Sequence, residues 1–354
     1  MGKLQSTVTG ALQSMYMRAL TRAVQSVLEK QIRFWKEVFR KALAQTNISL
    51  ACNKRTFDRF YVMLQDPHAK PIVVSLEFLN FITSDFSEDQ VLGRGGFGVV
   101  YKGILQNRKA IAVKRLKICQ ENLDDAQYKK ELKNLFGLQH KNIKESQGTG
   151  KCVMAEIRER MLCFEYVSEK SLREHISDES CGLSWQERFE IIKGICSGLH
   201  YLHTKRDIAH MDLKPENILL DKNMVPKIAD FGTSRLFDKN ESRIITTNCV
   251  GSLGYMPPEY MNEGLVSKKA DIFSFGVIIQ ELLTGSKSND IQDKRNLRKY
   301  VVGKWKNRPD ADSRQVRTCI EIASECVDTN REKRPTTDYI IQKLNEVKVV
   351  LALT

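Results

Sequence analysis

The chain reads IAHMDLKPENILLD over residues 208–221 and KIADFG over residues 227–232. Phosphoryl transfer from a nucleotide needs a carboxylate beside the attacking hydroxyl, a cation near the transferred phosphate, and oxygen ligands for a divalent cation. The two stretches supply these types in order: Asp212, then Lys214, then Asn217 with Asp230. Either aspartate alone would more often be a helix cap or a turn residue. The ordered set is hard to explain in that way, so it predicts phosphoryl-transfer chemistry.

A glycine-rich stretch with the spacing G-x-G-x-x-G precedes these residues in the chain. Glycine lets backbone N–H groups approach phosphates because no Cβ intervenes. A dinucleotide-binding fold uses similar glycines but needs a helix directly after them, whereas residues 99–109 read as strand, turn and strand. We therefore expect a hairpin that covers a nucleotide, formed by Gly93, Arg94, Gly95, Gly96, Phe97 and Gly98.

A lysine ends the next apolar run, residues 111–114. At the end of a strand, the Lys114 ammonium could pair with the α- and β-phosphates of ATP. Its natural partner is a carboxylate on a helix, and Glu131 lies in a stretch with helical spacing of Leu132 and Leu135. Taken alone, Glu131 could equally be a surface charge.

Further motifs complete a resemblance to eukaryotic protein kinases, and more closely to plant receptor-like kinases, over about residues 75–350. The stretch MLCFEYV at 161–167 resembles the family's hinge strand, and GSLGYMPPE at 251–259 resembles its substrate-side loop. DIFSFG at 271–276 resembles the helix that anchors the catalytic loop, and Arg334 fits the partner of Glu259. The resemblance implies an α+β, two-lobed fold within a kinase domain at 71–354: an N-lobe at about 85–164 with one main helix, a hinge at 165–167 and a helical C-lobe at 168–351.

The resemblance also implies roles in catalysis. Lys114 and Glu131 would form the ion pair that orients the phosphates of ATP. Asp212 would accept or orient the hydroxyl proton, and Lys214 would stabilise the γ-phosphate. Asn217 and Asp230 would hold Mg²⁺, with Mn²⁺ as the alternative metal. The Lys-Pro-Glu-Asn form of the catalytic loop is similar to serine/threonine kinases, so serine or threonine in protein substrates is the expected acceptor.

The resemblance also implies which residues would bind the adenine base of ATP. Adenine would bond to the backbone of Glu165 and Val167, and Phe164 would be the gatekeeper behind it. The side chains expected to pack on the adenine faces are Val100, Ala112 and Leu219.

One departure from the family concerns regulation. Met211 stands where most kinases carry the arginine that receives an activation-loop phosphate. A phosphate on the activation-loop candidates Thr246, Thr247 or Ser252 therefore cannot order the loop through that charge pair. Asp212 is intact, so the departure concerns regulation more than chemistry.

A second departure concerns the small lobe. Residues 144–150 read KESQGTG where the family has an apolar fourth strand, and the apolar residues that follow at 152–157 could supply a displaced strand. Without such a strand the Lys114–Glu131 pair would be loosely held. This stretch therefore keeps a second interpretation open, a pseudokinase that binds nucleotide or partner kinases without phosphoryl transfer. A deletion, or an error in the predicted coding sequence, would give the same polar stretch in place of the fourth strand.

Composition excludes several other classes. The chain has 354 residues, of which 42% are hydrophobic and 28% are charged, which argues against a disordered or collagen-like protein. Its sequence contains no uncharged apolar run of 18 residues and no secretory signal pattern. The nine cysteines are scattered, without C-x-x-C spacing, so we expect reduced thiols in a cytoplasmic protein.

Positive charge is concentrated at the N-terminus. Residues 1–60 hold eleven Lys/Arg and three acidic residues, +8 of the total +13. Residues 11–46 contain no Gly or Pro and predict an amphipathic, basic helix. The start Met-Gly2-Lys-Leu-Gln-Ser matches a myristoylation pattern. We expect residues 1–70 to form a basic extension that binds an anionic membrane surface at its cytoplasmic face, near a membrane receptor complex.

The basic segment allows two alternatives to membrane binding. The predicted helix could instead pack against the kinase body or a partner helix, with its basic side solvated. Nucleic-acid binding has little support, because the basic segment lacks aromatic–basic interleaving on a recognisable reader fold.

Overall fold

The computed structural model describes residues 73–95, 98–105, 108–116, 138–144, 153–155, 161–166, 171–177, 182–237, 242–285, 294–306, 308 and 311–347. All of them belong to one compact unit, residues 60–354. Several sequence predictions lie outside the described residues: the N-terminal extension with Gly2 and its helix, Gly96, Phe97, Glu131, Val167 and the polar stretch 145–150.

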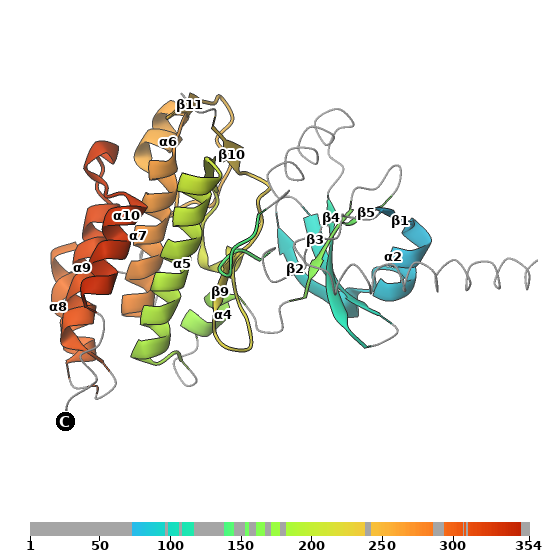
Figure 1. Ribbon diagram of the computed structural model, residues 1–354, viewed down its shortest axis with the longest axis horizontal. Coiled ribbons are helices and arrows are strands. Elements are labelled where there is room, and N and C mark those ends of the chain that lie inside the picture. Colours follow the sequence, from blue (N-terminus) through green and yellow to red (C-terminus); the bar gives the residue numbers. More distant parts are fainter. Residues whose placement is uncertain are drawn as a thin grey trace, which may run out of the picture. The chain divides into compact units, whose positions relative to one another are not determined.

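A six-stranded sheet forms the N-lobe (Figure 1), in the order β1-β5-β6-β4-β3-β2. The strands β2 to β6 pair antiparallel with their neighbours, and β1 pairs parallel with β5. Both faces of β4 are covered, since the four consecutive residues 111–114 are all buried. Its β-branched residues pack well on a pleated surface, and Ile111 and Val113 are almost fully buried. The strands are β1 (Val73–Val74), β2 (Val91–Gly95), β3 (Gly98–Ile104), β4 (Ala110–Leu116), β5 (Val153–Ala155) and β6 (Met161–Glu165).

The glycine-rich stretch lies at the hairpin between β2 and β3. Gly95 pairs with Gly98, and a strand rather than a helix follows the glycines. This confirms the reason for preferring a hairpin to a dinucleotide-binding fold. A Cβ at Gly98 would lie 2.3 Å from the carbonyl oxygen of Arg115, so the close approach of β3 to β4 requires glycine there.

The displaced strand predicted for residues 152–157 is confirmed as β5. Val153 pairs with Cys163 and Met154 with Leu162 on β6. On its other side β5 pairs with β1. The N-lobe sheet is therefore extended beyond β6 despite the polar residues that precede β5.

Helix α2 (Leu76–Thr83) was not anticipated from the sequence. Ser75 caps it by accepting a hydrogen bond from the Phe78 N–H at 3.2 Å, and Phe78 and Leu79 are fully buried. A Cβ at Gly103 of β3 would lie 3.1 Å from Ile82. The helix therefore packs directly on the sheet. A short 3-10 helix (Glu88–Gln90) follows it.

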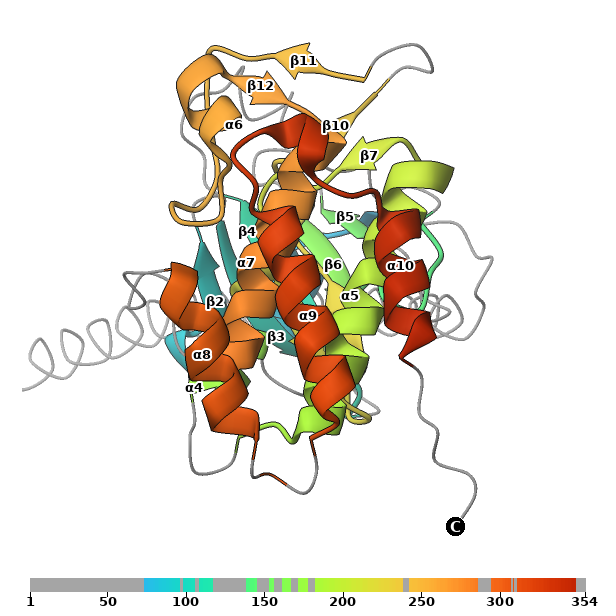
Figure 2. The same ribbon diagram turned by 90° about the vertical axis from the view of Figure 1, so that its left-hand side faces the viewer.

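The C-lobe is helical, as predicted (Figure 2). Helix α7 contacts α5, α8 and α9, and α10 packs on α5 and α9. A capping box of Ser184 and Glu187 starts α5, which satisfies N–H groups that no helical carbonyl can reach. The helices are α4 (Leu172–Ser177), α5 (Trp185–Lys205), α6 (Pro258–Glu263), α7 (Lys268–Thr284), α8 (Lys294–Trp305), α9 (Ser313–Cys326) and α10 (Thr337–Glu346).

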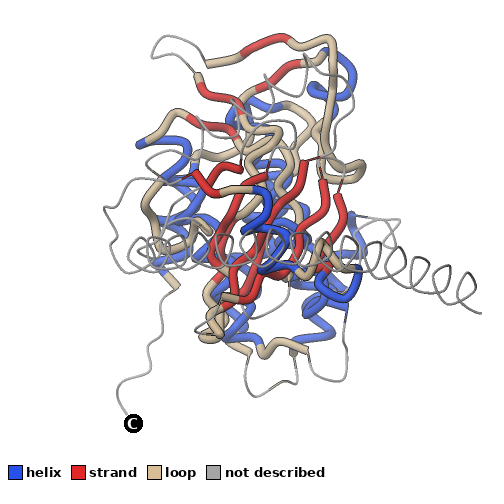
Figure 3. Tube along the Cα trace, turned by 90° about the vertical axis from the view of Figure 1, so that its right-hand side faces the viewer, coloured by secondary structure: helices blue, strands red, loops and turns tan. Residues whose placement is uncertain are grey.

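The C-lobe also contains three pairs of short antiparallel strands, and two of these pairs bracket the loops that carry Asp212, Lys214, Asn217 and Asp230. Figure 3 draws all strands in red. The pairs are β7 (Ile208–Ala209) with β10 (Arg235–Leu236), β8 (Ile218–Leu220) with β9 (Pro226–Ile228), and β11 (Ile244–Ile245) with β12 (Leu265–Val266). Residues 210–217 join β7 to β8, and residues 229–234 join β9 to β10. The β-rich N-lobe and helical C-lobe together confirm the predicted α+β class.

A buried ion pair fixes α6 to the loop before α10. Arg334 donates two hydrogen bonds to Glu259, at 2.7 and 2.8 Å. The Arg334 side chain is fully buried. The pairing predicted for these two residues is confirmed.

Candidate active site

One carboxylate in α7 anchors the loop that carries Asp212. Asp271 is fully buried and accepts hydrogen bonds from the N–H of His210 at 2.7 Å and of Met211 at 2.8 Å. The Nε2 of His203 also lies 2.8 Å from it. Burial alone would raise the pKa of the Asp271 carboxyl, but the hydrogen bond and charge of His203, the nearby His210 and the N–H of Met211 together hold the pKa below its ordinary value. The anchor is therefore charged, and the predicted role of the 271–276 helix is confirmed.

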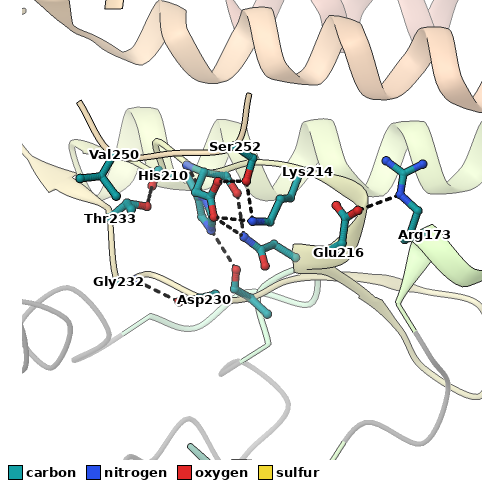
Figure 4. A network of polar contacts seen from close by, with 12 residues as sticks. Arg173, His210, Lys214, Glu216, Asp230, Gly232, Thr233, Val250 and Ser252 are labelled. Carbon is teal, nitrogen blue, oxygen red and sulfur yellow. Dashed lines mark hydrogen bonds and ion pairs between the residues drawn. The ribbon is translucent and has the colours of Figure 1, made fainter. Parts of the chain in front are cut away.

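The loop beyond the anchor brings three predicted residues together. Asn217 donates from Nδ2 to the carbonyl oxygen of Asp212 at 2.8 Å and to its Oδ2 at 3.0 Å. The Lys214 Nζ lies 3.0 Å from the same Oδ2. Asp212 is 8% exposed, so its carboxylate is held by neighbours and still reaches the surface. Figure 4 shows this network.

A serine hydroxyl also lies at this carboxylate. The Ser252 hydroxyl donates to Asp212 Oδ1 at 2.8 Å and accepts from the Lys214 ammonium at 2.6 Å. The sequence indicated Ser252 only as an activation-loop candidate beside Thr246 and Thr247. The other two candidates have different surroundings: Thr247 is exposed, and the Thr246 N–H donates a hydrogen bond to the carbonyl of Gly264. A hydroxyl can therefore sit against the Asp212 carboxylate at the position of Ser252.

The second predicted carboxylate joins the two lobes. The Lys114 Nζ of β4 lies 2.7 Å from Asp230 Oδ1, which also accepts from the N–H of Gly232 at 3.3 Å. Burial alone would raise the pKa of the Asp230 carboxyl, but the Lys114 ammonium holds it below its ordinary value. Asp230 is therefore an anion at neutral pH. The structure brings Lys114 to Asp230, while its predicted pairing with Glu131 lies outside the described residues.

The donor set around Asp230 suits a hard cation that is completed by phosphates. The Asn217 amide nitrogen is committed to Asp212, which leaves the amide oxygen as the atom of that side chain able to bind a cation. In the part of the chain that the structure describes, no cluster of three His, Cys, Asp or Glu could hold a metal by itself. Magnesium is usually bound by one or two carboxylates together with substrate phosphates, so Asn217 and Asp230 fit Mg²⁺ beside a nucleotide.

The predicted adenine contacts come from both lobes. Ala112 on β4 pairs with Phe164 on β6, and both are buried. Val100 on β3 pairs with Lys114, and Leu219 lies on β8, both partly buried. Glu165 is the last residue of β6, which places its backbone where the chain leaves the N-lobe sheet.

The glycine hairpin leaves open space above its backbone. A Cβ at Gly93 or Gly95 would meet no atom within 4 Å. These two glycines therefore serve no packing need in the described structure, and their backbone is accessible to a ligand. Arg94 between them forms an exposed ion pair with Glu88.

Met211 lies in an apolar cluster. Its side chain is 6% exposed and packs with Ala209, Phe237, Tyr260, Val266 and Ala270. The Tyr260 hydroxyl bonds to both the N–H and the carbonyl of Val250. These two hydrogen bonds connect the activation segment, which contains Val250, to α6. The connection lies beside the apolar cluster that takes the place of the missing arginine.

Comparison with known proteins identifies protein kinases as similar to this chain. The protein kinase domain family matches residues 86–344. Receptor-like serine/threonine-protein kinase SD1-7 of Arabidopsis thaliana is 39% identical over 77% of this chain and 34% of its own length. G-type lectin S-receptor-like serine/threonine-protein kinase RKS1 of the same plant is 41% identical, over 73% and 32%. Cysteine-rich receptor-like protein kinase 28, also from Arabidopsis thaliana, is 37% identical, over 82% and 45%.

The chain thus spans less than half the length of these relatives. Within the described residues, none of the helices combines the length and the apolar character that crossing a bilayer demands.

Replacing Met211 with arginine tests the apolar cluster. We expect Met211→Arg to lower the free energy of unfolding by at least about 2 kcal/mol, because the cluster offers the guanidinium no carboxylate. Urea unfolding of dephosphorylated protein measures the change. The control Met211→Leu keeps the volume and should cost less than about 1.5 kcal/mol. Equal stability of the two variants would contradict the packing described for Met211.

Proposed function

The chain belongs to the protein kinase family and to its plant receptor-like serine/threonine branch, and from this premise we propose that it transfers the γ-phosphate of ATP to serine or threonine hydroxyls of protein substrates. The contact of a hydroxyl with Asp212 carries this proposal. Ser252 donates to the Asp212 carboxylate at 2.8 Å while Lys214 donates to the same hydroxyl oxygen. A substrate hydroxyl bound in the same way would have its proton directed at Asp212 and a cation beside its oxygen.

The residues around Asp212 have separate tasks in this mechanism. Asn217 fixes the carboxylate through Oδ2, so Oδ1 is the oxygen that faces the hydroxyl. Lys214, 2.6 Å from that hydroxyl oxygen, stabilises charge that develops on the transferred phosphate. Because Asp271 holds the loop backbone, these groups are oriented before the substrate binds, which reduces the reorganisation needed in the transition state.

Nucleotide binding falls to residues of both lobes. Lys114 pairs with the α- and β-phosphates, as does the backbone of the glycine hairpin from Gly93 to Gly98. Asp230 and Asn217 would hold Mg²⁺, which would neutralise charge on the phosphate oxygens when bound. Adenine packs between Val100, Ala112 and Leu219, and it bonds to the backbone at Glu165 and Val167. The proposed pair of Lys114 with Glu131 completes this arrangement.

The pseudokinase alternative now has less support. It rested on a small lobe weakened by the polar stretch after Ile143, and β5 supplies a paired strand directly after that stretch. Lys114, Asp212, Lys214, Asn217 and Asp230 are all present, and each described contact between them suits transfer. A measurement of phosphate transfer distinguishes an active kinase from a pseudokinase.

Phosphate incorporation tests the proposed function. We expect the purified chain with Mg-ATP to phosphorylate a protein substrate on serine or threonine, measured by radiolabel and phosphoamino-acid analysis. Asp212→Ala should lower the rate by about 100-fold or more, because general-base catalysis contributes that much. A folded wild-type chain without incorporation, or a variant as fast as wild type, would contradict the proposal.

We also propose that residues 1–60 attach the kinase to an anionic membrane surface at its cytoplasmic face, close to a membrane receptor complex. The support is their net charge of +8 and the pattern at Gly2. One myristoyl chain binds a membrane only marginally, so stable attachment requires a second signal. Basic residues near anionic lipid supply about 1 kcal/mol each.

Cell fractionation tests this attachment. We expect Gly2→Ala to move a fluorescent fusion of the chain from the membrane to the soluble fraction. Replacing Arg33, Lys36 and Arg40 with glutamine should have a similar but smaller effect. Retention of the Gly2→Ala variant at the membrane would refute the lipid part, and retention of the charge variant would refute the electrostatic part.

A further inference from the structure

A second concentration of positive charge lies in the helical C-lobe. Residues 294–317, which form α8, the following loop and the start of α9, contain nine Lys/Arg and two Asp, a net charge of +7. The 270 residues outside this segment and outside residues 1–60 contain 36 Lys/Arg and 38 Asp/Glu, a net charge of −2. The positive charge of the chain is therefore concentrated in two segments, and the structure describes most of the second one.

The cations of this second segment lie on the outer side of α8 and α9. Val301 and Trp305 of α8 and Val316 of α9 are buried in the C-lobe core, which turns the opposite sides of both helices to solvent. Figure 2 shows the two helices side by side. We call the exposed cations of this segment the α8–α9 patch: Arg298, Lys299, Lys306, Arg308, Arg314 and Arg317.

Four cations of the α8–α9 patch form no ion pair with any described residue: Arg298, Lys299, Lys306 and Arg317. The Arg314 guanidinium lies 3.7 Å from the Asp312 carboxylate, which also caps α9. By contrast, the buried Arg334 of the same lobe is paired with a glutamate. Like charges that lie close together repel one another and destabilise a compact fold. The patch therefore indicates an anionic partner rather than a role in holding the fold together.

The arrangement of the patch suits a broad anionic surface. Its cations are distributed over two helices and the loop between them, and none of them is among the residues assigned to nucleotide or substrate. Tyr300 lies among these cations and is 51% exposed. A tyrosine ring has an apolar body and a polar hydroxyl, and such rings are enriched where proteins meet lipid headgroups. A bilayer that contains anionic lipid is the partner that these observations favour.

We propose that the α8–α9 patch is a second membrane contact, through which the kinase domain itself binds the anionic headgroups of a bilayer. Figure 1 shows α8 and α9 at the end of the C-lobe away from the N-lobe sheet, so lipid at the patch would not cover the glycine hairpin. Two contacts with one surface raise the effective concentration of each other. The patch would thus orient a kinase that residues 1–60 already hold near the membrane. The proposal goes beyond the attachment proposed for residues 1–60, because it assigns lipid binding to the kinase domain.

Vesicle binding of the full chain tests the patch. The Gly2→Ala background removes lipidation, and flotation with phosphatidylcholine vesicles, with or without phosphatidylserine, gives the Kd. The patch variant Arg298→Gln/Lys299→Gln/Arg317→Gln should bind phosphatidylserine vesicles at least about tenfold more weakly, because each lost charge weakens binding by up to about fivefold.

A matched control separates the patch from total charge. The variant Lys205→Gln/Lys222→Gln/Lys333→Gln removes the same charge from exposed lysines of other segments. It should bind phosphatidylserine vesicles within about threefold of the parent chain. Circular dichroism and urea unfolding establish that each variant is folded.

A tyrosine variant separates a lipid surface from a soluble polyanion. Tyr300→Ser should weaken vesicle binding by about threefold, because the ring no longer enters the headgroup region. Binding of the same variant to polyglutamate should not change. Patch-dependent binding of polyglutamate or RNA without patch-dependent binding of vesicles would overturn the proposal in favour of a soluble partner.

Two further results would overturn the proposal: a patch variant that binds vesicles within about twofold of the matched control, or a parent chain that binds vesicles equally well with and without phosphatidylserine. The extension variant Arg33→Gln/Lys36→Gln/Arg40→Gln separates the two membrane contacts. If it loses binding while the patch variant keeps it, the patch proposal fails and attachment by residues 1–60 stands. The opposite result supports the patch and refutes the electrostatic part of that attachment.

Discussion

The buried carboxylate of Asp271 is the constraint on which the rest of the site depends. Two backbone N–H groups of the catalytic loop and the His203 ring converge on it. Met211 takes a φ of 69° there, a left-handed conformation that a side chain rarely adopts without support from its surroundings. Hydrogen bonds to a charged group contribute about 1.5–3 kcal/mol each, enough to hold this conformation. The turn directs Asp212 toward Lys214, Asn217 and Ser252.

Other contacts of the C-lobe extend that anchor. Arg334 and Glu259 hold α6, whose Tyr260 in turn bonds to Val250 of the activation segment. The pairing of β11 with β12 closes the same region. Most kinases carry an arginine at the position of Met211, and this arginine pairs with an activation-loop phosphate. In this chain the apolar packing of Met211 takes the place of that ion pair. The activation segment is therefore held in the described structure by apolar packing and by hydrogen bonds, which include those of Ser252 to Asp212 and Lys214.

Much of this architecture could be predicted from the sequence because it depends on short motifs with fixed spacing. The α+β class, the Glu259–Arg334 pair, the anchoring helix and the displaced strand β5 were all expected, and the structure confirms them. Asp212 and Asn217 lie close because only four residues separate them in one loop.

The features that the sequence did not reveal depend on contacts between distant positions. Arg173 meets Glu281 across 108 residues, and Ser252 meets Asp212 across 40. Such pairs leave no periodic pattern, so the sequence indicated Ser252 only as an activation-loop candidate and gave no role to Arg173. Helix α2 was missed for another reason: its apolar residues Phe78, Leu79 and Ile82 occupy little more than two turns, too short a stretch to show a clear helical period.

The most direct test of this account is the effect of Asp271→Asn on transfer rate and on nucleotide affinity, measured on protein shown to be folded. An amide offers one oxygen where the carboxylate offers two, so one loop N–H loses its acceptor. We predict that kcat falls by at least about tenfold while the Kd for Mg-ATP changes by less than about threefold, because the anchor orients the loop rather than the nucleotide. A kcat within about twofold of wild type would contradict the account, as would a loss of Mg-ATP affinity as large as the loss of kcat.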